Sequence, residues 1–109
     1  MSKHEFGIMD CIPKSGKRYD KYEPQKYNCI SINDNDLEKI VEKLIEIEVY
    51  HHTLDNKQKG LAYCGITLIP PCSLGLMLDA IINSSELKEL YEMMLKAQKD
   101  NKWIIHFGI

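Results

Sequence analysis

The amino-acid sequence predicts an α+β fold, a ferredoxin-like split βαββαβ sandwich over residues 27–109, preceded by an extra N-terminal strand and a long loop. The predicted order of elements is strand, helix, strand, strand, helices, strand, which is the order of that motif. Three apolar stripes with helical spacing mark the helices, and runs of β-branched and aromatic residues mark the strands. A chain of 109 residues, 44% of them hydrophobic, is long enough for a single domain with one core.

The first 26 residues fall outside this pattern and are expected to form an N-terminal extension. Glu5–Ile12 has apolar residues in imperfect alternation and is expected to be a strand that extends one edge of the sheet. Residues 13–26 begin with Pro13, contain Pro24 and one glycine, and are expected to form a loop. Loops of this length are uncommon in compact domains and often carry function.

The first strand and helix of the core follow directly. Tyr27–Ile32 is expected to be extended and Asp34–Glu46 helical, with Asn33 as the N-cap. The helix is predicted from one apolar stripe at positions i, i+3, i+4, i+7 and i+8, made by Leu37, Ile40, Val41, Leu44 and Ile45.

A hairpin is expected next. Glu48–Leu54 and Leu61–Ile69 are predicted strands, and the polar residues 55–60 between them are a predicted turn. Two prolines then end the second strand. Ser73–Asn101 is expected to be helical with a break at residues 83–86, and Trp103–Ile109 is the expected final strand.

The expected strand order places Tyr27–Ile32 and Leu61–Ile69 at the centre of the sheet, and side-chain alternation then assigns the two faces. The residues predicted beneath the helices are Ile30, Ile32, Ile47, Val49, Ile66, Leu68, Ile105 and Phe107. The opposite face is predicted to carry Tyr27, Cys29, Ser31, Tyr50, His52, Tyr63, Gly65, Thr67 and His106. Three hypotheses account for this aromatic face: residues 1–26 cover it, a partner or second copy binds it, or it stacks nucleic-acid bases.

Composition narrows the function classes. A net charge of −2 argues against a nucleic-acid binder, and no apolar run approaches the roughly 18 residues of a membrane span. The polar start, Met1–Glu5, lacks the apolar stretch of a signal peptide, so a cytoplasmic location is expected. Four cysteines without a CxxC pair predict neither a zinc site nor a disulfide framework, but reduced and mostly buried thiols.

No motif predicts catalysis, a metal or a cofactor. His51 and His52 are neighbours in a predicted strand, so they point to opposite faces and cannot chelate one ion. Ser15-Gly16-Lys17 resembles the end of a phosphate-binding loop, but the upstream glycine of that motif is missing.

The loop of residues 13–26 is the strongest candidate for binding. Five cations, Lys14, Lys17, Arg18, Lys21 and Lys26, stand against two acids, Asp20 and Glu23, so the loop carries +3 and the rest of the chain −5. Arginine and tyrosine are favoured anchors of protein interfaces. The candidate binding residues, from the loop and the aromatic face, are Lys17, Arg18, Tyr19, Tyr22, Tyr27, Tyr50, His52, Tyr63 and His106.

These observations favour a small cytoplasmic non-catalytic binding module that associates with a protein partner or with a second copy of itself. An immunity- or antitoxin-like binder is a narrower form of this hypothesis. The alternative is a small-molecule-binding protein or a small enzyme, with a pocket between the sheet and the 13–26 loop. In that case His52, His106 and Cys29 would be its polar or nucleophilic groups, and they would have to converge in space.

Overall fold

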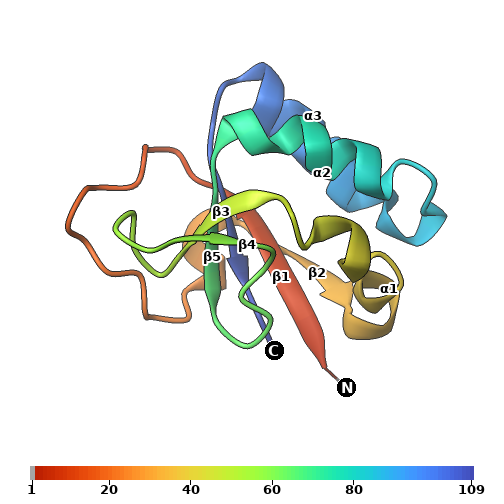
Figure 1. Ribbon diagram of the computed structural model, residues 1–109, viewed down its shortest axis with the longest axis horizontal. Helices are drawn as coiled ribbons and strands as arrows, with labels where there is room; N and C mark the ends of the chain where they lie inside the picture. Colours follow the sequence, from red (N-terminus) through yellow and green to blue (C-terminus); the bar gives the residue numbers. More distant parts are fainter. Residues whose placement is uncertain (1) are drawn as a thin grey trace.

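The computed structural model describes residues 2–109, and its centre is one six-stranded sheet (Figure 1). The strands are β1 (Lys3–Ile8), β2 (Ile30–Asn33), β3 (Glu48–His51), β4 (Lys57–Lys59), β5 (Ile66–Ile69) and β6 (Ile104–Phe107). Their order across the sheet is β2-β1-β6-β5-β3-β4. Every neighbouring pair is antiparallel.

The helices lie on one face of this sheet, so the predicted α+β class is confirmed (Figure 1). They are α1 (Asp34–Glu38), α2 (Leu74–Ile81) and α3 (Lys88–Lys99), with the short 3-10 helices η2 (Val41–Leu44), η3 (Pro71–Ser73) and η4 (Ser85–Leu87). A further 3-10 helix, η1 (Pro24–Tyr27), belongs to the N-terminal segment, and its Tyr27 packs on the opposite face. Within residues 2–109, no helix is long and apolar enough to cross a bilayer.

The ferredoxin-like strand arrangement is not confirmed. It requires the strands around residues 27–32 and 61–69 to be parallel neighbours at the centre, but β2 lies at one edge and pairs with β1 alone. β5 instead pairs with β3 and β6. The reason is that β1 is not an edge addition. It lies between β2 and β6 and places the fully buried Phe6 in the core.

Several predicted elements differ in extent. The strand expected over Glu5–Ile12 is Lys3–Ile8, and the strand expected over Tyr27–Ile32 begins only at Ile30, because Pro24–Tyr27 form η1. The helix expected over Asp34–Glu46 breaks after α1, because Ile40 leaves the helical region with φ −118° and ψ 4°. The side chain of Asn33 caps α1 as predicted, by accepting from the Asn35 N–H. Like charges four residues apart, as in Glu38 and Glu42, weaken a continuous helix beyond this start. In the predicted hairpin, part of the expected turn forms β4, and only the end of Leu61–Ile69 forms a strand.

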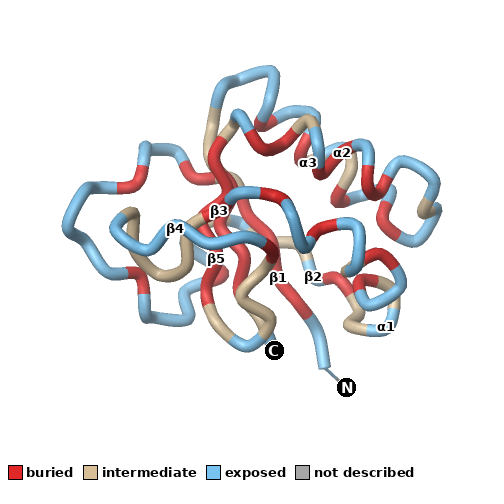
Figure 2. Tube along the Cα trace, viewed as in Figure 1, coloured by how far each residue is buried: buried red, intermediate tan, exposed pale blue. Residues whose placement is uncertain are grey.

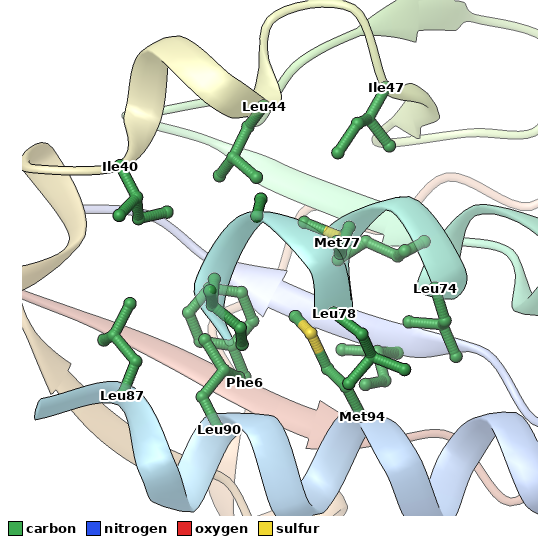
Figure 3. Close-up of a cluster of buried hydrophobic side chains, with 14 of the residues drawn as sticks. Phe6, Ile40, Leu44, Ile47, Leu74, Met77, Leu78, Leu87, Leu90 and Met94 are labelled. Atoms are coloured by element: carbon green, nitrogen blue, oxygen red, sulfur yellow. The ribbon is translucent and has the colours of Figure 1, made fainter. Parts of the chain in front are cut away.

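The main core lies between the sheet and the helices. Figure 3 shows Leu87 of η4 and Leu90 and Met94 of α3 pointing toward residues of α2 and toward Phe6 on β1. These three side chains are at most 1% exposed, as is Phe6. Most residues of the predicted helical stripes therefore lie in this core, whereas Ile45 is 57% exposed because the first helix breaks before it.

A second core covers the opposite face, and its composition corrects the predicted face assignment. Ile66, Leu68, Ile105 and Phe107, predicted beneath the helices, form this second cluster with Met9 and Tyr19 of the N-terminal segment. Thr67 and His106, predicted on the opposite face, point toward the helices instead, where His106 packs on Phe6. All four residues of β5 and all four of β6 are buried. Alternation of apolar and polar residues therefore could not indicate which side chains point toward the helices. The assignments of Ile32 and Val49 to the helix side were right.

Candidate functional site

Residues 9–27 cross the outer face of the sheet and are here called the basic loop. Figure 1 shows this segment, in red and orange, extending to one side of the sheet, and Figure 2 shows that most of it is exposed with short buried contacts. Backbone hydrogen bonds attach it at Met9, whose N–H donates to Trp103 O at 2.9 Å, and at Tyr19, whose N–H donates to His52 O at 2.7 Å. The loop therefore has a defined course over the sheet.

Tyr19 is the residue that anchors the centre of the basic loop. It is only 9% exposed and belongs to the second core. Its hydroxyl accepts from the Lys14 N–H at 3.1 Å, and Lys17 Nζ lies 4.9 Å from the ring centroid, within the range of a cation–π interaction. The aromatic ring thus fixes both the loop backbone and one lysine.

Tyr22 and Tyr27 hold the second half of the loop against Phe107 of β6. Their rings lie 5.5 and 6.1 Å from the Phe107 ring, and Lys26 Nζ lies 5.7 Å from the Tyr27 ring. The Tyr22 hydroxyl donates to the Glu5 carboxylate, which raises the pKa of Tyr22, and burial raises the pKa of Tyr27. Both phenols are therefore uncharged near the lysines at neutral pH.

His52 ties the loop to the sheet just beyond β3. Its backbone adopts a left-handed conformation with φ 65°. Its Nδ1 lies 2.9 Å from Asp20 Oδ1 and 3.0 Å from Tyr19 O, while Nε2 accepts from the Ile66 N–H at 3.4 Å. The Nδ1–H is therefore the donor. Asp20 also accepts from Arg18 Nε at 2.7 Å, so Arg18 and His52, both predicted to bind a partner, donate instead to a carboxylate of their own loop.

Two hollows of about 350 and 390 Å³ lie along the basic loop. Lys17, Tyr19, Lys26 and Tyr27 line both. The first also includes Met9, Asp10, Cys11, Ile12 and Lys14, and the second Arg18, Asp20, Lys21, Glu23 and Ile105. The lysines of the loop (Lys14, Lys17, Lys21 and Lys26) form no ion pair with any residue in the described range 2–109.

The remaining predicted site residues lie elsewhere. Tyr50 packs against Trp103, with ring centroids 5.7 Å apart. Tyr63 and His106 contact His4 on the helix side of the sheet, whereas Cys29 contributes to the core on the outer side. Burial and the nearby Glu5 raise the pKa of the Cys29 thiol to about 12, so it is not an activated nucleophile. The convergence of His52, His106 and Cys29 that an enzyme would need is not observed.

A buried chain of hydrogen bonds beneath the helices was not predicted. His4 Nε2 lies 2.9 Å from Asp34 Oδ1, and His4 Nδ1 lies 2.9 Å from His106 Nε2. His106 Nδ1 lies 3.1 Å from Thr67 Oγ1, which accepts from the Ala62 N–H at 2.8 Å. His4 and His106 are 102 positions apart, and only the pairing of β1 with β6 brings them together.

The direction of this chain follows from its ends. The hydroxyl of Tyr63 also donates to Asp34, and this bond and that from His4 lower the pKa of Asp34, which is therefore a carboxylate and only accepts. His4 therefore donates through Nε2, and when both rings are neutral its Nδ1 accepts from His106 Nε2–H. The Thr67 hydroxyl donates to His106 Nδ1. Every polar atom has a partner, so the chain is a satisfied structural network.

Metal binding is not supported by the arrangement of ligands. No group of three or more His, Cys, Asp or Glu side chains suited to a metal ion occurs within residues 2–109. The four cysteines are unpaired, but the prediction that most are buried was wrong: only Cys29 is partly buried, and Cys11, Cys64 and Cys72 are exposed.

Gly7 of β1 provides a test of how closely the basic loop packs against the sheet. A Cβ added there would lie 2.7 Å from Tyr27 Cβ and Tyr27 O and 2.8 Å from Cys29 Sγ. We expect Gly7→Ala to destabilise the protein by about 1–3 kcal/mol, because neither an interior strand nor the Tyr27 backbone can move freely. Urea denaturation measures this. Gly16→Ala is not a matched control because Gly16 has a positive φ, so Gly75→Ala, whose new Cβ makes only an ordinary 3.5 Å contact, serves instead. Equal stability of Gly7→Ala and wild type would show that the Tyr27 contact is not tight.

Comparison with known proteins adds no relative: no family model, no curated protein and no solved structure matches this chain.

Proposed function

We propose that the chain is a non-catalytic binding module whose basic loop binds an acidic segment of a protein partner. The observation that carries the proposal is the set of loop lysines without ion pairs in the described residues, arranged around tyrosine-lined hollows. Fixed tyrosines cost little conformational entropy on binding, and the lysines supply electrostatic attraction. The unpaired cysteines suit the reducing cytoplasm that we propose as its location.

An exposed apolar residue beside the first hollow suggests that the bound segment is not only acidic but also carries an apolar side chain. Ile12 lines the first hollow and is 71% exposed, the most of any large hydrophobic residue within residues 2–109. Met9, 4% exposed, contributes to the same hollow. An acidic segment that carries an apolar side chain complements this combination better than a purely charged one, because apolar burial adds affinity that salt does not screen.

Replacing Lys17 and Lys26 together by glutamine tests the proposal. We expect a labelled glutamate-rich peptide with one leucine to bind wild type measurably in fluorescence anisotropy at low salt, and the double variant to bind about tenfold more weakly. Each lost exposed charge pair contributes up to about 1 kcal/mol. The matched control is Lys43→Gln with Lys99→Gln, which removes the same charge from exposed positions outside the loop. Equal losses in the two double variants would refute a site in the loop.

Self-association is the second form of the proposal. Outside residues 13–26 the chain carries a net charge of −5, so a second copy offers an acidic surface to the loop. Mass measurement in solution over a range of protein concentrations separates the two forms. A monomer at all concentrations leaves only the heterologous partner.

A small anionic ligand is a second candidate function, favoured by the hollow volumes of about 350 and 390 Å³, which fall within the usual range of small-molecule pockets. The same Lys17 and Lys26 variants, titrated with inorganic phosphate instead of the peptide, test it.

A further inference from the structure

The buried pair formed by His4 and His106 lies outside the proposed binding surface and has a chemistry of its own. Both residues are 0% exposed, and their rings stack with centroids 5.1 Å apart. They belong to β1 and β6, two neighbouring strands inside the sheet. Histidine is the side chain that ordinarily gains a proton between pH 7 and 5, so a fully buried pair of them makes folding depend on pH.

The geometry limits how many protons the folded pair can hold. The four ring nitrogens face Asp34, each other and Thr67. The shared His4–His106 hydrogen bond has room for one proton, so the pair carries at most three N–H protons, one more than two neutral rings. In the unfolded chain below about pH 6, both rings become imidazolium and carry four. The folded state therefore binds at least one proton fewer.

We infer that the His4–His106 pair is an acid-sensitive element that destabilises the fold as the pH falls from about 6 to 4, and with it the basic loop. β1 links the two features. His4 is followed by Glu5, which accepts from Tyr22 of the loop, and Gly7 lies against Tyr27. The loss of binding in acid rests on the proposed function, whereas the loss of stability does not.

The shifted pKa values of His106 and Asp34 both make the fold less stable in acid. Burial, and then the neighbouring His4 and His51, lower the pKa of His106 to about 3 from its ordinary 6.5. A base with a lowered pKa in the folded state contributes stability that is complete above about pH 6.5 and is lost as the pH falls toward 3. Asp34, with its lowered pKa, also loses its contribution in acid, below the usual carboxylate range. Tyr63, whose bond to Asp34 raises its pKa to about 12, stays neutral throughout.

Helices α2 and α3 present apolar side chains to this face of the sheet, including Met77, Leu90 and Met94. They offer no counter-charge to an imidazolium. The apolar cover therefore disfavours a charged pair, in addition to the limit that the hydrogen-bond geometry sets.

The test is urea denaturation of the full chain at pH values from 7 to 4, with no binding partner present. We expect the folding equilibrium constant of wild type to fall about tenfold more per pH unit than that of His106→Gln between pH 6 and 4, because the variant has one proton fewer to exclude. The control Leu76→Ala changes a side chain that is 60% exposed and removes no titratable group, so it should keep the wild-type slope.

Parallel slopes for wild type and His106→Gln would overturn the inference. If His106→Gln does not fold, His4→Gln gives the same comparison. An independent measurement on wild type follows the imidazole resonances by NMR: two imidazolium rings at positions 4 and 106 in the folded protein at pH 4.5 would also overturn it. Because no peptide is used, failure of the binding proposal leaves this result unaffected.

Discussion

Replacing Phe6 by alanine is expected to destabilise the protein by about 3–5 kcal/mol, the usual cost of deleting a large buried aromatic side chain. Phe6 is 0% exposed on an interior strand, and its ring packs 4.7 Å from that of His106. Figure 3 shows its side chain among residues of α2 and α3, so deletion of the ring would leave a cavity inside the main core. Since small domains are stable by about 5–15 kcal/mol, the loss removes much of the total.

The measurement is the free energy of unfolding from urea titration, followed by the fluorescence of Trp103, the only tryptophan. Ile12→Ala is the control, since a side chain 71% exposed should change stability by less than about 0.5 kcal/mol. A cost below about 1 kcal/mol for Phe6→Ala would contradict the interior position of β1 and restore its expected role as an edge extension.

The helices show what the sequence could predict. Leu87, Leu90 and Met94 recur with helical spacing, and all three are buried in the core. An apolar stripe along a helix determines which face of that helix packs against the rest of the protein. The loop over residues 13–26 was also foreseeable, since prolines and clustered lysines are unsuited to a packed element; residues 9–12, expected to be strand, belong to it as well. The structure places Lys17, Tyr19 and Tyr27 around the same hollows.

The faces and the order of the strands could not be predicted from the sequence. The four residues of β5 and the four of β6 are buried on both faces of the sheet, so a pattern of period two had no polar side to identify. The position of β1 depended on pairing across the whole chain, and Lys3 meets Asn33 while Glu5 meets Phe107. Contacts between residues so distant in sequence leave no local signal, which is why His4 and Asp34 were not candidates.

Phe107→Ala is expected to destabilise the protein by a similar amount, about 3–5 kcal/mol, and in addition to loosen the basic loop. Phe107 is 2% exposed and lies on the opposite face of the sheet from Phe6, in contact with Tyr22 and Tyr27. Removing its ring leaves the second half of the loop without its main apolar contact. The two variants thus make the same substitution, a buried phenylalanine to alanine, on opposite faces of the sheet.

Limited trypsin digestion separates the two effects, because the loop offers cleavage sites at Lys14, Lys17, Arg18 and Lys21. Under conditions in which global unfolding is rare, cleavage within the loop should be about tenfold faster in Phe107→Ala than in Phe6→Ala, since local opening costs less than global unfolding. Phe107→Leu, which keeps most of the apolar contact, should lose less than about 1.5 kcal/mol and keep the wild-type cleavage rate. Equal loop cleavage in both alanine variants would mean that the loop opens only when the whole domain unfolds. The basic loop would then be a cooperative part of the domain core and not a binding surface that can open independently.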